Sequence, residues 1–151
     1  MKNYKNYVAL CLIGLVLGFT QLVAQENHGN ALNTFVKFGS SSSIAVNYEI
    51  QVANDITLAP TARIWFSGNN TFALGGRGDF YFDRLFGLAE PWDIWAGADA
   101  GIVVAGESNK DDFNLNLHAG VEYKFSNMFG VIFEFGGGST SSGGIGLAFH
   151  F

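Results

Sequence analysis

Apolar and polar side chains alternate along most of the chain after residue 30, and this pattern constrains the fold more than any other feature. The clearest stretch is DFNLNLHAGVEYKF at 112–125, in which every odd-numbered residue from Phe113 to Phe125 is apolar and every even-numbered residue is polar or small. Because side chains in a strand alternate between two faces, this segment predicts a strand with one apolar and one polar face. After residue 24, no stretch keeps apolar residues at helical spacing for three turns.

Segments of this kind recur along the chain with short connections between them. They span 31–39, 43–52, 56–67, 71–83, 92–104, 112–125, 128–136 and 143–151, and turn residues lie at 40–43, 53–55, 68–70, 84–91, 106–111, 126–127 and 136–144. Strands joined so tightly are antiparallel neighbours. The sequence therefore predicts an all-β, eight-stranded antiparallel up-and-down fold.

The first 24 residues have the organisation of a secretory signal peptide. Lys2 and Lys5 precede an uncharged apolar run at 8–19, and the small residue Ala24 closes a cleavage site before Gln25. The run is about a dozen residues long, whereas a membrane-spanning helix needs about 20. We therefore expect residues 1–24 to be removed and residues 25–151 to form one domain.

Cysteine content and charge narrow the possible functions. Cys11 is the only cysteine, and it lies inside the apolar run after Leu10, which disfavours the alternative of a lipoprotein signal with Cys11 as the lipidated residue. The exported domain would then have neither disulfides nor thiol chemistry. The formal net charge of −5 argues against nucleic acid as a partner, since phosphate binding needs a basic surface.

The polar faces of the segments carry charges in mid-strand. An antiparallel barrel of this kind is either soluble, with its apolar face inside, or embedded in a membrane, with its apolar face outside. An eight-stranded barrel is just wide enough for side chains to fill its interior, and charges of both signs could neutralise one another there. We therefore expect a lumen charge network of Lys37, Glu49, Arg63, Arg77, Asp79, Asp99, His118, Glu122, Lys124 and Glu134.

The aromatic residues of the apolar faces concentrate near the ends of the segments. One group contains Phe38, Phe66, Phe72, Phe113 and Phe135, and the other contains Phe80, Phe82, Trp92, Tyr123, Phe125, Phe129, Phe149 and Phe151. Aliphatic and small residues such as Val46, Leu74 and Leu117 lie between the two groups. Two aromatic girdles around an aliphatic band are typical of an outer-membrane barrel.

The final segment, GGIGLAFHF, alternates apolar Ile145, Leu147, Phe149 and Phe151 with small residues and His150. It resembles the C-terminal strand of outer-membrane barrels, and residues 25–151 as a whole resemble the small eight-stranded outer-membrane proteins of Gram-negative bacteria of the OmpX, OmpW and OmpA-barrel kind. The resemblance implies a transmembrane barrel in the bacterial outer membrane, with outer-membrane lipid, lipopolysaccharide and the barrel-assembly machinery as partners. It also implies that Phe149 and Phe151 belong to the assembly signal. With both termini in the periplasm, the connections near 40–43, 68–70, 106–111 and 136–144 would face the outside.

Catalytic and metal sites are not expected. Ser126 lies in a two-residue turn about 25 Å along the strand from His118, so a nucleophile and base cannot meet. We expect His28, His118 and His150 to occupy separate regions, and no cysteine or paired-histidine spacing supports zinc, so no metal site or cofactor is implied. The acidic stretch GESNKDD at 106–112 is interpreted as a solvated loop rather than a weak cation site, and the GRGD stretch at 76–79 as an internal ion pair.

Three functions are compatible with this pattern. The first is a non-catalytic outer-membrane protein with a structural or interaction role and a lumen filled by charges. The second is a narrow pore lined by the same charges. The third is a soluble periplasmic barrel that binds an apolar ligand inside.

Overall fold

The computed structural model of this chain describes residues 28–39, 41–66, 71–104, 112–140 and 143–151. The expected signal peptide at 1–24, with Cys11, lies outside the described residues. The connections at 68–70 and 106–111 also lie outside them.

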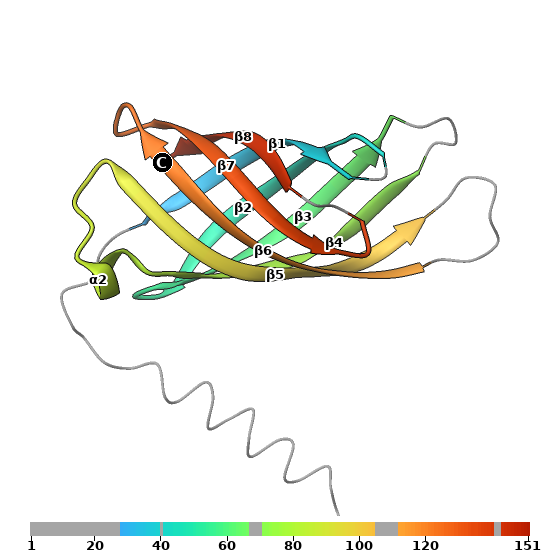
Figure 1. Cartoon of the computed structure of the whole chain (residues 1–151), viewed down its shortest axis with the longest axis horizontal. Coiled ribbons are helices and arrows are strands. Elements are labelled where there is room, and N and C mark those ends of the chain that lie inside the picture. Colours follow the sequence, from blue (N-terminus) through green and yellow to red (C-terminus); the bar gives the residue numbers. More distant parts are fainter. Residues whose placement is uncertain (1–27, 40, 67–70, 105–111, 141–142) are drawn as a thin grey trace, which may run out of the picture.

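Eight antiparallel strands form a closed barrel in which each strand pairs with the next one in the sequence and β8 pairs with β1 (Figure 1). Consecutive antiparallel pairing confirms the predicted up-and-down topology. The ladder of β1 and β8 runs from Ala31 opposite His150 to Phe38 opposite Gly143. The strands are β1 (Asn30–Phe38), β2 (Ser43–Ala53), β3 (Ile56–Trp65), β4 (Phe72–Tyr81), β5 (Trp92–Val104), β6 (Asp112–Lys124), β7 (Phe129–Gly138) and β8 (Gly143–His150).

Two connections differ from the sequence prediction. The tract at 136–144 was expected to be a loop, but β7 continues through Gly138, and Gly136 pairs with His118. The connection after β4 contains a short helix, α2 (Asp83–Phe86), which ends at Gly87 in the left-handed conformation that glycine favours. Within the described part of the chain, no helix is both long and apolar enough to cross a membrane.

Burial alternates along the strands as the sequence pattern predicts. In β1, Asn33 and Lys37 are buried whereas Val36 and Phe38 are exposed. Phe35 departs from the pattern, because it is a large apolar residue on the polar face, and it is nevertheless buried inside the barrel with 2% exposure. Gly146 on β8 provides the space, since a Cβ atom there would lie 2.6 Å from Cδ1 of Phe35.

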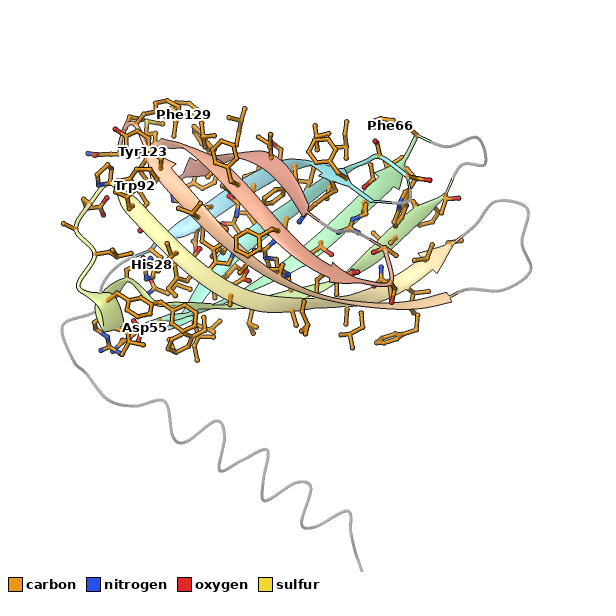
Figure 2. The ribbon with its side chains drawn as sticks, viewed as in Figure 1. His28, Asp55, Phe66, Trp92, Tyr123 and Phe129 are labelled. Carbon is orange, nitrogen blue, oxygen red and sulfur yellow. The ribbon has the colours of Figure 1, made fainter. Side chains whose placement is uncertain are left out.

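The outer surface of the barrel is apolar. Every strand contributes exposed large apolar side chains, and residues in the middle of strands are among the most exposed, with Leu117 at 65% and Leu147 at 58%. Most exposed aromatic residues lie toward the two ends, as Figure 2 shows for Phe66 at one end and for Trp92, Tyr123 and Phe129 at the other. Phe133 is an exception, since it lies in the middle of β7 with 51% exposure. The apolar faces of the alternating strands therefore point outward and the polar faces point inward.

Candidate functional site in the barrel interior

The structure places the predicted lumen residues on the inner face of the barrel. All of them are buried except Asp99 and Lys124, which are partly exposed. They do not form one network. The largest group, which we call the central charge cluster, contains Lys37, Arg77, Asp79, Asp99, His118 and Glu134.

Glu134 on β7 lies between two cations in the central charge cluster. Its Oε1 atom accepts a hydrogen bond from Lys37 on β1, and its Oε2 atom lies 2.5 Å from Nη1 of Arg77 on β4. In the sheet, Lys37 and Glu134 both lie opposite Gly144 of β8, one on each side. Because Gly144 has no side chain, the lysine and the carboxylate meet across β8; a Cβ atom at Gly144 would lie 2.9 Å from Cδ of Lys37.

Arg77 connects Glu134 to the acidic residues on the opposite side. Its Nε atom lies 2.5 Å from Oδ2 of Asp79, two residues along β4. The structure thus shows the internal ion pair expected for the GRGD stretch. Each carboxylate holds the guanidinium through a charge-assisted hydrogen bond, the stronger class of such bonds.

His118 on β6 completes the cluster. Its Nε2 atom lies 2.6 Å from Oδ1 of Asp79, and its Nδ1 atom lies 3.5 Å from Oδ2 of Asp99 on β5. Asp99 also accepts a hydrogen bond of 2.8 Å from the side-chain amide of Asn116. The expected contact of His118 with a neighbouring carboxylate is therefore present.

Aromatic rings pack against the cations of the cluster. The Lys37 Nζ atom lies 4.5 Å from the centroid of the Phe35 ring, and the Arg77 guanidinium carbon lies 5.7 Å from the same ring. The same guanidinium carbon lies 6.0 Å from the ring of Trp95. Phe35, the large apolar residue on the inner face of β1, thus has an electrostatic role, since cations are attracted to aromatic faces at such distances.

The four remaining predicted residues contact other partners. Arg63 donates a hydrogen bond of 2.8 Å to Thr140, and Lys124 forms an ion pair of 2.6 Å with Asp93. Glu122 lies 2.7 Å from Nε2 of His150, and Glu49 accepts hydrogen bonds from Asn33 and from the hydroxyl of Tyr81.

Sequence analysis did not name several of these partners as site residues: Asn33, Tyr81, Asp93, Thr140 and His150. The alternation itself could have found Asp93, which has the same parity as Asp99 on β5.

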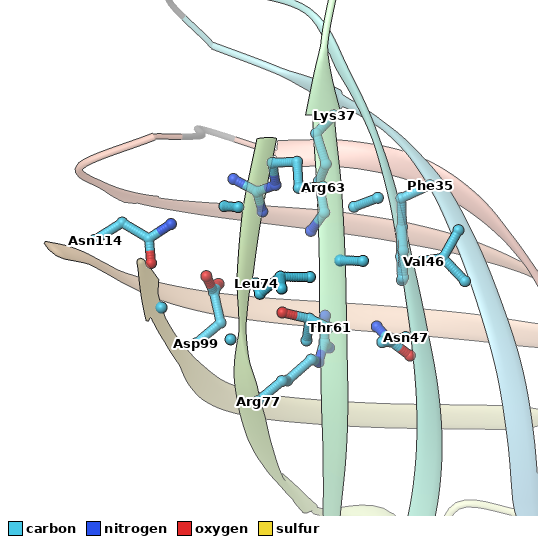
Figure 3. A pocket seen from close by; sticks show the side chains of 15 residues that line it. Phe35, Lys37, Val46, Asn47, Thr61, Arg63, Leu74, Arg77, Asp99 and Asn114 are labelled. Carbon is cyan, nitrogen blue, oxygen red and sulfur yellow. The ribbon is translucent and has the colours of Figure 1, made fainter. Parts of the chain in front are cut away.

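Space inside the central region is small. A cavity of about 20 Å³ lies among Phe35, Lys37, Arg63, Arg77 and Asp99 (Figure 3). This volume is about that of one or two water-sized probes, so the cavity has room for little more than a water molecule. Side chains therefore fill the barrel at this level.

The end of the barrel that carries α2 is more open and holds a second group of polar residues. A cavity of about 560 Å³ there is lined by His28, Lys124 and His150 among others. The expectation that His28 and His150 occupy separate regions is therefore wrong, because closure of the barrel brings the residues before β1 and at the end of β8 to the same cavity. His28 also lies beside two buried carboxylates, Asp83 and Asp93.

Comparison with solved structures identifies the fold. The N-terminal β-barrel domain of Pseudomonas aeruginosa OprF superposes with a TM-score of 0.60 at 15% identity, over 81% of this chain and 96% of that chain. Neisserial surface protein A (NspA) gives a TM-score of 0.51 at 16% identity, over 81% of this chain and 95% of that one. A chain from the de novo design of transmembrane β-barrels gives a TM-score of 0.63 at 16% identity, over 83% of this chain and 98% of that one.

These similarities show that the chain has the fold of small eight-stranded outer-membrane barrels. No model of a protein family matches the sequence. No curated protein matches it either.

Proposed function

We propose that this protein is a transmembrane β-barrel of the bacterial outer membrane, exported through the signal peptide at 1–24, with a closed interior and a structural or interaction role. One observation carries the proposal: apolar side chains cover the outside of the barrel, and charged side chains fill the inside. The fold shared with OprF and NspA supports the same location.

The exposed side chains explain why we favour a membrane over water. Leu117 and Leu147 lie in the middle of their strands, and each exposes more than half of its surface. Each Å² of apolar surface left in water costs about 25 cal/mol, and monomeric soluble proteins rarely expose contiguous apolar patches larger than a few hundred Å². In a bilayer, the aliphatic band would face the hydrocarbon region and the aromatic girdles would lie at the interfaces.

The interior supports a closed barrel rather than the alternative pore. An open path for hydrated ions would have to pass the central charge cluster, where the cavity measures about 20 Å³. Moving Arg77 out of the way would break ion pairs with both Asp79 and Glu134. The same polar contents argue against the third alternative, a soluble barrel with an apolar ligand inside.

A non-catalytic role fits the positions of the residues that could have formed a nucleophilic site. Ser126 is exposed, and its hydroxyl accepts a hydrogen bond of 3.1 Å from the backbone N–H of Phe129. His118 is buried between Asp79 and Asp99. The hydroxyl and the imidazole therefore have separate partners.

The proposed partners follow from the outer surface and the last strand. Outer-membrane lipid and lipopolysaccharide would contact the aliphatic band and the girdles. The barrel-assembly machinery would recognise Phe149 and Phe151, which lie in edge-to-face contact with ring centroids 4.8 Å apart.

Cell fractionation tests the location, and planar bilayers test the closed interior. We expect the protein in detergent-extracted outer membranes, with a gel mobility that changes on heating, because a folded barrel stays compact in detergent until it is heated. Recovery in the periplasmic fraction would refute membrane residence. In planar bilayers we expect no stepwise conductance, and regular conductance steps from the wild-type protein would replace the closed barrel with the pore.

A further inference from the structure

The end of the barrel that carries α2 contains a mixed set of imidazole and carboxylate groups. His28 lies two residues before β1, Asp83 begins α2 and Asp93 is the second residue of β5. One ligand atom from each of the three lies within 4.8 Å of the others, and all three residues are buried. Figure 2 shows His28 inside this end of the barrel.

We propose that His28, Asp83 and Asp93 bind one divalent transition-metal ion, such as Zn²⁺. One imidazole nitrogen with two carboxylate oxygens is a ligand set for borderline ions of the first transition row. Around a tetrahedral ion with bonds of about 2.1 Å, ligand atoms lie about 3.4 Å apart. Since the three atoms lie within 4.8 Å of one another, they would have to approach by at most about 1.4 Å, which rotations of the three side chains can supply.

Contacts around the three residues orient them. The His28 ring stacks on Tyr81, with centroids 4.1 Å apart and planes at 23°. Asp83 accepts a hydrogen bond of 2.7 Å from the backbone N–H of Ile94, and Asp93 contacts Lys124. A carboxylate has two oxygens, so it can be oriented through one and bind a metal through the other.

Local charge favours a cation at this position. Asp93 lies directly opposite Glu122 in the β5–β6 ladder, so three buried carboxylates, those of Asp83, Asp93 and Glu122, gather at this end. Lys124 contacts Asp93, and His150 contacts Glu122. A dication between Asp83 and Asp93 would add positive charge where two carboxylates converge in a poorly hydrated environment.

The neighbouring cavity would give the ion a route to His28, the one proposed ligand that lines it, and room for a water molecule as fourth ligand. The cavity of about 560 Å³ is lined by His28 and is large enough to hold water. Three protein ligands and one water is the arrangement of an accessible zinc site. In a barrel with both termini in the periplasm, the ion would enter from the periplasm and would tie the segment before β1 to the connection between β4 and β5.

Metal titration of the folded barrel in detergent tests this site. The exported form without a histidine tag is titrated with Zn²⁺ by calorimetry and with Co²⁺ by visible absorption. We expect one ion to bind per barrel, and the bound Co²⁺ to show the visible absorption bands of an ion with a low coordination number. The key variant is His28→Ala, because His28 precedes the strands and its replacement leaves every ladder intact. Loss of a direct ligand should weaken Zn²⁺ binding by at least the roughly 10- to 100-fold that loss of an outer-shell partner costs.

The matched control is His150→Gln, which removes a histidine from the same cavity but outside the proposed ligand set. It should keep Zn²⁺ affinity near that of the wild type, whereas Asp93→Asn should weaken it as His28→Ala does. Zn²⁺ should also raise the urea midpoint of the wild type but not of His28→Ala, because a ligand stabilises only the state that binds it. The proposal is wrong if the wild type binds no Zn²⁺, or if His28→Ala binds as tightly as the wild type. Equal losses from His28→Ala and His150→Gln would also overturn the assigned ligands. These measurements do not depend on where the protein resides in the cell.

Discussion

Replacing Glu134 by glutamine should destabilise the barrel strongly, because Glu134 holds two buried cations. Lys37 and Glu134 have side-chain exposures of 4% and 2%, and Arg77 reaches the same carboxylate. In Glu134→Gln, Arg77 keeps the carboxylate of Asp79. Lys37 loses its carboxylate partner and keeps the Phe35 ring and a neutral amide oxygen, neither of which balances its charge. Removing one partner of a buried ion pair costs about 3–5 kcal/mol, so we expect a loss of that size in the free energy of unfolding.

The double variant Lys37→Met/Glu134→Gln separates this cause from a general packing defect. It removes the cation that Glu134→Gln leaves without a carboxylate, and replacing a buried pair by apolar or neutral groups is often nearly neutral. We therefore expect the double variant to recover most of the stability lost in the single variant. Arg84→Gln is the control at the barrel end, since the Arg84 side chain is 49% exposed whereas its partner Asp55 is 9% exposed, and we expect a smaller loss than in Glu134→Gln, where both the carboxylate and its cations are buried.

The assay is reversible urea unfolding of the barrel in lipid vesicles, followed by tryptophan fluorescence. The free energies of the wild type and the three variants are compared at the same lipid composition. A loss in Glu134→Gln no larger than that in Arg84→Gln would refute the view that the central charge cluster stabilises the barrel. A double variant as unstable as Glu134→Gln would refute the view that an uncompensated Lys37 causes the loss.

Three further predictions address packing, the outer face and assembly. Gly120→Val should lower the free energy of unfolding by about 1–3 kcal/mol in the same assay, because a side chain there would overlap the Trp95 ring. Gly76→Val is the control and should change this free energy little, since a Cβ atom at Gly76 meets nothing within 4 Å. Leu117→Arg should cost about 2–4 kcal/mol in bilayers if its exposed face meets lipid, and a change near zero would contradict the proposed orientation. Deletion of Phe151 should reduce the amount of folded barrel in cell membranes while leaving refolding in detergent intact; normal assembly would exclude it from the signal.

The strands and their faces could be predicted from sequence because alternation is a local property. The pattern that assigns Lys37 to the inner face needs only its immediate neighbours. The contact of Lys37 with Glu134 joins residues 97 positions apart and depends on the register of every strand pair around the barrel. Neither the period of two nor the turn residues determine that register completely, so the sequence predicts which residues point inward but not which of them meet.

The same limit explains the end of the barrel near α2. His28 precedes the first strand, whereas Asp83 and Asp93 flank the connection between β4 and β5. Their proximity results from closure of the sheet and from the position of the short helix. The prediction of a loop at 136–138 was wrong for a different reason. Glycine is typical of loops, but here Gly136 lets β7 pass close to the β6 backbone. A Cβ atom at Gly136 would overlap the backbone beside His118.

The meeting of Lys37 and Glu134 over Gly144 has a kinetic consequence. A barrel that comes apart between its first and last strands must separate β1 from β8, and that step pulls Lys37 away from a carboxylate held on β7. We therefore expect the Lys37–Glu134 ion pair to raise the activation barrier for separating β1 from β8. If this ion pair forms after the folding transition state, its loss should increase the unfolding rate more than it decreases the folding rate.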